Sequence, residues 1–351
     1  MDRVIESVGE FGRYQRLLTF FLGLISSLAA MTIYSTVFTA SSPEFLCYHK
    51  ASSEVLSNSC DAWNSLDKDN ETECKFDNTY YEKTIVTEYE LICDKSFLVG
   101  LTQTIYMVGT ICGLFIGYFS DKYGRKKVGL VLSILLSFVL VTSELFQIFD
   151  INWMIKYVIY CIGQFMIGAL AKALYLVIYI LLIEITTSKY STMVSNLYLY
   201  MYVVGEILVL VFAYFFRNWH ILSWAISGYS VIMIFIIVFL VPESPRYLAT
   251  KNKIEECKAV LKTIAEKNKK TLTNEENLFI KNTIESCSDI KLDKIDTESQ
   301  KEETKKKKSN LSHLWRPRKN LFQTLMFVFL WFALSLIYYG VSLGKVILFY
   351  F

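Results

Sequence analysis

Charged and aromatic side chains recur at helical spacing inside stretches of the chain that are otherwise apolar. Lys172, Tyr175 and Tyr179 stand at positions i, i+3 and i+7, and Tyr202 and Glu206 stand at i and i+4. Each spacing places its side chains on one face of a helix. A tyrosine offers the face of its ring to cations and its hydroxyl to polar groups. If the two faces meet, they form an aromatic cleft that can bind a small organic ion.

The two charges in this group also allow a structural interpretation. An ionisable group near the middle of a membrane is costly unless it is paired or hydrated. Lys172 lies 12 residues before Glu184, and Glu206 lies 15 residues after Ser191. Both are therefore about 20 Å from the nearer loop at helical rise. An ion pair between Lys172 and Glu206 would offset the cost of both charges, and tyrosines such as Tyr198 also suit helix packing. The sequence leaves a binding cleft and a structural pair both open.

A second group with chemical potential lies between two apolar stretches. Residues 117–126 read GYFSDKYGRK, which is a G-x3-D-x2-G-R-K pattern. Gly124 permits a tight turn. Asp121 is a strong hydrogen-bond acceptor at a helix end, and Arg125, followed by Lys126, is a fork-shaped donor for carboxylates. The pattern predicts a charged turn that connects two helices.

Long apolar helices must position both groups. The chain of 351 residues is 53% hydrophobic and only 20% charged, with a mean hydropathy of +0.36. A helix needs about 20 apolar residues to cross a bilayer, and buried helices of soluble proteins rarely stay free of charge that long. The long apolar stretches of the chain are 17–40, 97–119, 128–143, 151–183, 191–216, 219–241 and 321–344. We therefore predict an all-α, polytopic membrane protein with seven spans.

The basic residues indicate how these spans are oriented. The short loop 121–127 carries four of them. The 41–96 segment holds 5 basic and 12 acidic residues, whereas the 242–320 segment holds 19 basic and 13 acidic residues. Lys and Arg collect in cytoplasmic loops, so residues 1–16 and 242–320 are expected in the cytoplasm and residues 41–96 outside. The polar start predicts that 17–40 is an uncleaved anchor.

Cysteines in the 41–96 segment predict an oxidising environment. Cys47, Cys60, Cys74 and Cys93 lie there, and disulfides persist outside the cell. Four cysteines allow three pairings, and the sequence does not choose among them. A zinc site lacks the close CxxC pairs that such sites use. Asn70 begins an N-x-T glycosylation sequence on the same side.

Three further stretches accompany the charged turn: VGEFGRYQ at 8–15, EYELICDKSF at 88–97 and PESPRYL at 242–248. With the cysteine-bearing 41–96 segment and the aromatic residues of 331–340, they resemble solute carrier family 22, the organic cation, carnitine and organic anion transporters of the major facilitator superfamily. The resemblance runs from about Val4 to Gly340. Sugar facilitators also carry a stretch like PESPR, but the long outer segment distinguishes solute carrier family 22 from them.

The resemblance implies a twelve-span, major-facilitator-type bundle in which two six-helix halves rock about a central site to give alternating access. In such families, cytoplasmic charges latch the outward-facing state. The corresponding residues here are Asp121, Arg125, Glu184, Glu243 and Arg246, with Gly124 and Lys126 in the turn. The resemblance also matches Lys172 to a family lysine and Tyr338 to an aromatic cage residue, with Trp331 nearby.

Two positions depart from the family pattern. The family usually has arginine at the position of Ser191, and it tends to have arginine early in the fourth span, at the position of Gln164. We expect both losses to thin the cytoplasmic charge network. The chain also ends at Phe351, after seven of the twelve spans, so we expect a fragment, a truncated isoform or a faulty gene model.

Three classes of function follow. The first is a plasma-membrane transporter of small organic ions (cations, carnitine-like zwitterions or anions) whose coupling ion the sequence does not give. The second is a truncated half-molecule that binds or regulates full-length partners. The third is a seven-helix receptor, which needs its N-terminus outside the cell; the basic short loop contradicts this orientation. Three scattered histidines support neither an enzyme nor a metal or cofactor site, and a net charge of +3 does not indicate a nucleic-acid partner.

Overall fold

The computed structural model describes residues 2–49, 55–57, 60, 63, 72–270 and 318–348. The chain forms two compact units, Met1–Ser288 and Asp289–Phe351. Asn70, which begins the glycosylation sequence, lies outside the described residues. The second unit contains α14 (Arg318–Leu348), whose apolar part is Leu321–Ile337.

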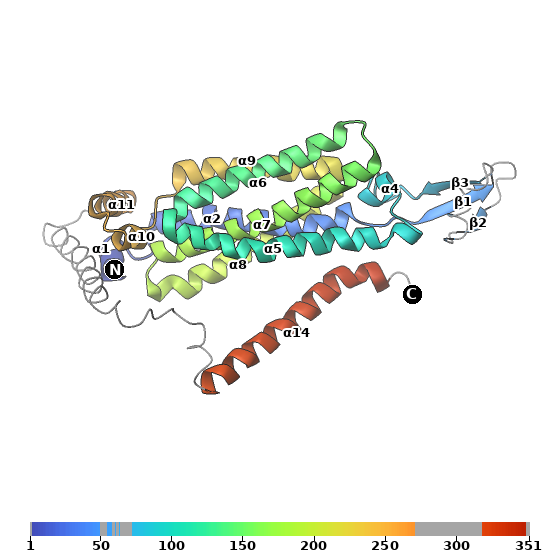
Figure 1. Cartoon of the computed structure of the whole chain (residues 1–351). Helices are drawn as coiled ribbons and strands as arrows, with labels where there is room; N and C mark the ends of the chain where they lie inside the picture. Colours follow the sequence, from blue (N-terminus) through green and yellow to red (C-terminus); the bar gives the residue numbers. More distant parts are fainter. Residues whose placement is uncertain are drawn as a thin grey trace, which may run out of the picture. The chain divides into compact units, whose positions relative to one another are not determined.

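Long apolar helices form the body of the first unit. They are α2 (Arg13–Thr39), α5 (Phe97–Tyr123), α6 (Arg125–Ile148), α7 (Trp153–Ile185), α8 (Ser188–Phe215) and α9 (Trp219–Leu240). Figure 1 shows them side by side along their lengths. Within the described part of the chain, these six are long and apolar enough to cross a membrane. The fold class predicted from the sequence, an all-α membrane protein with an incomplete bundle, is confirmed.

Small elements close the two ends of this bundle (Figure 1). At one end, here the α10 end, lie α1 (Asp2–Ser7), α10 (Pro245–Thr250) and α11 (Ile254–Lys267). At the other, the sheet end, lie β1 (Phe45–His49), β2 (Val55–Ser57), β3 (Thr72–Phe76), α4 (Ile85–Tyr89) and the 3-10 turn Cys93–Lys95. The strands form an antiparallel sheet in the order β2-β1-β3. The sequence did not predict this sheet, because its strands are short and lie in a polar segment.

Disulfides hold the segment between α2 and α5. Cys60 and Cys93 are bonded, with their Cα atoms 5.5 Å apart. Cys47 is buried and also disulfide-bonded, and the register of β1 and β3 sets it opposite Cys74. The Cys60–Cys93 bond ties the segment to the turn that starts α5, as the oxidising environment predicted for these cysteines implies.

Glycines allow the helices of the first unit to approach closely. α5 packs on α7, and α2 packs on α8. A Cβ atom added to Gly109 or Gly113 of α5 would collide with the backbone carbonyl oxygens of Phe165 or Ala169 in α7. A Cβ atom on Gly205 of α8 would collide in the same way with the backbone of α2. Small residues spaced four apart are a common device for backbone contact between membrane helices.

Gly109→Ala is expected to wedge α5 away from α7. Inserting a methyl group into a tightly packed interface costs about 1 to 3 kcal/mol, so the melting temperature of the purified chain should fall. The matched control is Gly117→Ala on the same helix, because no atom lies within 4 Å of the added methyl group there. An equal loss of stability in both variants would contradict the close approach of the two helices.

Candidate functional site

The predicted tyrosine faces of α7 and α8 meet. The ring of Tyr198 is 5.1 Å from the ring of Tyr175 and 5.5 Å from that of Tyr179. The rings of Tyr175 and Tyr202 are 6.0 Å apart. Tyr198 is fully buried, and its hydroxyl donates a hydrogen bond to the Tyr175 carbonyl oxygen at 2.9 Å. The four rings, here the tyrosine cluster, join the two helices by aromatic contact.

Charged groups flank the tyrosine cluster on both helices. The Nζ atom of Lys172 lies 5.1 Å from the centre of the Tyr175 ring. Glu206 is one turn beyond Tyr202 on α8, and both charged residues are half-buried. Tyr179 donates a hydrogen bond to the Ser195 hydroxyl oxygen at 3.1 Å. The arrangement offers three kinds of group to a ligand. The aromatic faces and the carboxylate of Glu206 suit a cation, and the ammonium group of Lys172 suits an anion.

The predicted residues of the seventh span lie in the other unit. Trp331 and Tyr338 are both on α14. α14 belongs to the second unit, whereas the tyrosine cluster lies in the first. Their part in a common site therefore stays a prediction.

The charged turn forms a cluster at the α10 end. Arg125 Nη2 donates to Asp121 Oδ1 at 2.8 Å and to Glu184 Oε1 at 2.9 Å. The guanidinium of Arg125 also lies 4.9 Å from the centre of the Tyr247 ring. The side chains of Arg125 and Glu184 are only 11% and 18% exposed, so this ion pair is shielded from solvent, whereas Asp121 is 65% exposed. One arginine thus connects α5, α6, α7 and α10.

Glu243 caps the start of α6. Its Oε1 atom accepts hydrogen bonds from the backbone N–H groups of Arg125 at 2.9 Å and Lys126 at 3.0 Å. A carboxylate is favourable at the positive end of a helix. Gly124 makes this possible, because it has a φ of +106° and an added Cβ atom would lie 2.6 Å from the Glu243 carboxylate. The turn therefore requires glycine for both conformation and space.

Arg246 joins the same end of the bundle through a partner that the sequence did not predict. Its Nη2 atom donates to Asp2 Oδ1 at 2.5 Å and to the Thr186 carbonyl oxygen at 3.3 Å. Asp2 also accepts a hydrogen bond from Ser188 Oγ at 2.6 Å. The helix α1 is thereby held against the turn between α7 and α8. Asp2 belongs to no sequence motif, so the residues around it do not predict its contact with Arg246.

The expectation for Gln164 is wrong. Gln164 lies 20 residues before Glu184 on α7, which is about 30 Å at helical rise. It lines a small cavity with Glu144 toward the sheet end, so it does not belong to the charge network around Arg125. The error arose because α7 begins at the sheet end, and an early position in this helix is far from the charged turn.

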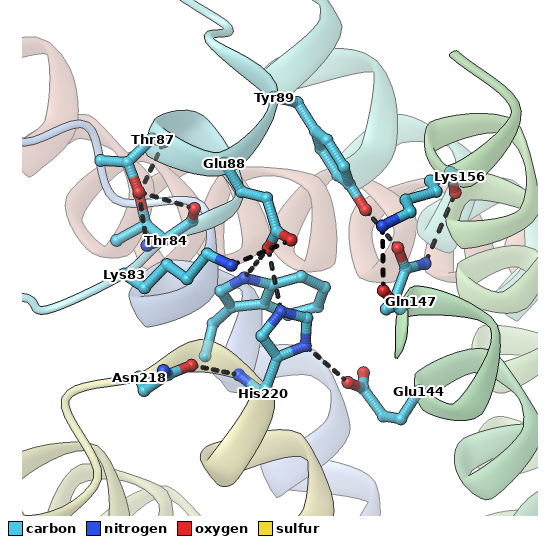
Figure 2. A network of polar contacts seen from close by, with 11 residues as sticks. Lys83, Thr84, Thr87, Glu88, Tyr89, Glu144, Gln147, Lys156, Asn218 and His220 are labelled. Atoms are coloured by element: carbon cyan, nitrogen blue, oxygen red, sulfur yellow. Dashed lines mark hydrogen bonds and ion pairs between the residues drawn. The ribbon is translucent and has the colours of Figure 1, made fainter. Parts of the chain in front are cut away.

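A further polar cluster at the sheet end has no counterpart in the sequence analysis. It is formed by Lys83, Glu88, Glu144, Trp219 and His220, here the sheet-end cluster. Figure 2 shows His220 between the two glutamates. Its Nε2 atom lies 2.9 Å from Glu88 Oε2 and its Nδ1 atom 3.3 Å from Glu144 Oε2. The cluster connects α4, α6 and α9.

Glu88 is the best-partnered carboxylate in the sheet-end cluster. It accepts hydrogen bonds from Trp219 Nε1 at 2.8 Å and lies 3.1 Å from Lys83 Nζ. Burial alone would raise its pKa, but the contacts with His220, Lys83 and Trp219 outweigh burial and lower the pKa to about 2. Glu88 therefore contributes stability that is present above its ordinary pKa and is lost as the pH falls toward about 2.

The fold of the bundle is similar to that of the solved structures of the xylose transporter XylE. The crystal structure of a double-Trp mutant of XylE matches with a TM-score of 0.54 at 14% identity. The match covers 72% of this chain and 50% of the XylE chain. The partially occluded inward-open xylose transporter XylE from E. coli matches with a TM-score of 0.51 at 16% identity, over 77% of this chain and 58% of that chain. These similarities show the fold alone.

The sequence matches at the level of a family. Residues 22–344 match the profile described as Sugar (and other) transporter, and the chain belongs to this family. It is 27% identical to the Organic cation transporter protein of Drosophila melanogaster and 26% identical to the Organic cation/carnitine transporter 2 of Homo sapiens. Both alignments cover 97% of this chain and 64% of the relative, so the chain spans less than two thirds of these relatives. The resemblance to solute carrier family 22 is confirmed.

Arg125→Lys is expected to destabilise the α10 end. A lysine keeps the charge but cannot bond Asp121 and Glu184 as a planar fork while stacking on Tyr247, which should cost about 2 kcal/mol. The measurement is the melting temperature of the purified chain. Lys127→Arg in the same turn is the control and should leave it unchanged. Equal melting temperatures for the Arg125→Lys variant and the unmodified chain would contradict this role of Arg125.

Proposed function

We propose that this chain is part of a transporter that moves small organic ions across the plasma membrane by alternating access. The observation that carries the proposal is the tyrosine cluster flanked by Lys172 and Glu206, in a bundle of the transporter family. The relatives named as organic cation and carnitine transporters support this class of substrate. The chain acts as a transporter and not as an enzyme.

The substrate contacts come from two helices of the first unit. Lys172, Tyr175 and Tyr179 lie on α7, and Tyr202 and Glu206 lie on α8, with the rings of Tyr175 and Tyr202 6.0 Å apart. Aromatic faces bind the cationic part of a substrate by cation–π attraction, and Lys172 binds a carboxylate. The resemblance to solute carrier family 22 adds Trp331 and Tyr338 of α14 as candidate substrate-binding residues. The charge of the substrate is therefore decided by the balance between Lys172 and Glu206.

The α10 end lies in the cytoplasm and acts as the gate. The gate residues are Asp121, Gly124, Arg125, Lys126, Glu184, Glu243 and Arg246. The bonds of Arg125 and Glu243 hold α5, α6, α7 and α10 together while the cytoplasmic side is closed. The sheet end lies outside the cell, where its disulfides persist and where Asn70 carries a glycan.

Tyr179→Ala and Glu206→Gln should each reduce uptake of a labelled quaternary ammonium ion about tenfold. This is the effect of removing a cation–π contact or a charge worth about 1.4 kcal/mol. Initial uptake rates into cells that express the full chain provide the measurement, corrected for surface expression. Tyr200→Ala is the control, because Tyr200 lies on the same helix α8 but is 65% exposed. Uptake kinetics unchanged in both variants would overturn the site.

Lys172→Gln separates the two kinds of substrate. Loss of the ammonium group should reduce uptake of an aromatic carboxylate or of carnitine at least tenfold and leave uptake of the quaternary ammonium ion unchanged or higher. The comparison uses the same cells and surface correction. Equal effects on both substrates would show that Lys172 is a packing residue.

A further inference from the structure

The contacts of His220 fix the number of protons in the sheet-end cluster. Both ring nitrogens face a carboxylate oxygen, Nε2 toward Glu88 at 2.9 Å and Nδ1 toward Glu144 at 3.3 Å. A neutral imidazole carries one N–H and can donate to only one of them. Both contacts are hydrogen bonds only if the imidazole is doubly protonated or if one carboxyl group keeps its proton. The pair of carboxylates and the ring therefore bind one proton more than neutral histidine supplies.

Burial locates the extra proton on the Glu144 side. The Glu88 carboxylate already accepts from Trp219 and lies beside Lys83, which stabilises its charge. The Glu144 side chain is only 5% exposed and has no lysine or arginine within 4.0 Å among the described residues. A buried, unpaired carboxylate is strongly unfavourable. The extra proton is thus shared between Glu144 and His220.

Glu144 also lines a small cavity. Its volume of about 30 Å³ is enough for one or two water molecules. Besides Glu144, its polar lining comes from Thr32, Ser35, Ser143, Gln164 and Ser223, on four helices of the bundle. His220, by contrast, is 23% exposed. A path of polar groups therefore runs from the surface of the sheet end through His220 and Glu144 to a space inside the bundle that is large enough for water.

No other titratable group near the cluster takes the place of this proton by pairing with the Glu144 carboxylate. Lys83 lies on the Glu88 side, and the Lys156 ammonium donates to the Gln147 carbonyl oxygen at 3.1 Å (Figure 2). Tyr89 of α4 donates its hydroxyl hydrogen to Gln147 Oε1, and Tyr160 of α7 packs edge-on against Trp219. No further group that faces Glu144 in the described structure supplies a positive charge.

We propose that Glu144 and His220, with the cavity that Glu144 lines, form a proton-binding site open to the extracellular side. When the proton moves from His220 Nδ1 to Glu144 Oε2, an imidazolium–carboxylate pair becomes a neutral imidazole and a carboxylic acid. Water at His220 or in the cavity supplies or takes up the proton. The site itself does not depend on the proposed transport activity, although a proton held here is placed to respond to extracellular pH.

The test is the melting temperature of the purified full chain between about pH 6 and about pH 9, the range around ordinary histidine titration. Loss of the proton leaves a buried charge unpaired, so the unmodified chain should melt about 5 °C lower at the alkaline end. In Glu144→Gln, the amide N–H₂ donates to neutral His220, so this variant should keep its melting temperature across the range. Glu82→Gln and His313→Gln are controls and should follow the unmodified chain.

Two results would overturn the proton site. The first is a Glu144→Gln variant whose melting temperature falls with pH in parallel with the unmodified chain. The second is a melting temperature raised by sodium chloride but not by choline chloride, with the rise lost in Glu144→Gln, because the cavity would then bind a metal cation. Uptake assays at the same pH values separate this proposal from the transport proposal, since the melting curves decide the proton site even in a chain that transports nothing.

Discussion

A charged group inside this bundle has to find its partner within the protein, because the surrounding helix faces are apolar and a lipid environment offers no water. This constraint organises the first unit. At the α10 end, Arg125 is bonded to Asp121 and Glu184. At the sheet end, His220 bridges Glu88 and Glu144. Polar clusters thus stabilise the two ends, and backbone contact through glycines packs the helices between them.

The middle of the bundle differs from its ends. There the ammonium group of Lys172 lies over the ring of Tyr175. A cation–π contact is weaker and less directional than an ion pair, so a ligand can replace it at low cost. Strong, shielded ion pairs suit a gate that must hold a state, whereas adaptable aromatic contacts suit a site that must bind and release. The distribution of interaction types along the bundle therefore matches the proposed alternating access.

Periodic features of the sequence were predictable, and contacts between distant residues were not. The faces of Tyr175 and Tyr202 follow from helical spacing alone, and the apolar stretches gave the long helices because bilayer thickness fixes their length. Asp2 pairs with Arg246 across 244 residues, and His220 meets Glu88 across 132, so only the folded chain reveals them. Gln164 lies near the sheet-end start of α7, so its distance from the charged turn depends on the direction of this helix, which its spacing from Glu184 gives.

The central claim is that the tyrosine cluster binds the transported ion. The most direct test is alkylation of a Tyr179→Cys variant, prepared with Cys112→Ser to remove the exposed free thiol of α5. The variant is treated in membranes with a small thiol reagent, with and without a quaternary ammonium ion, carnitine or an aromatic carboxylate. The account predicts that at least one of these ions slows alkylation in a saturable manner, at the concentrations that saturate uptake. Unchanged alkylation rates with every ion, in a variant that still takes one of them up, would contradict it.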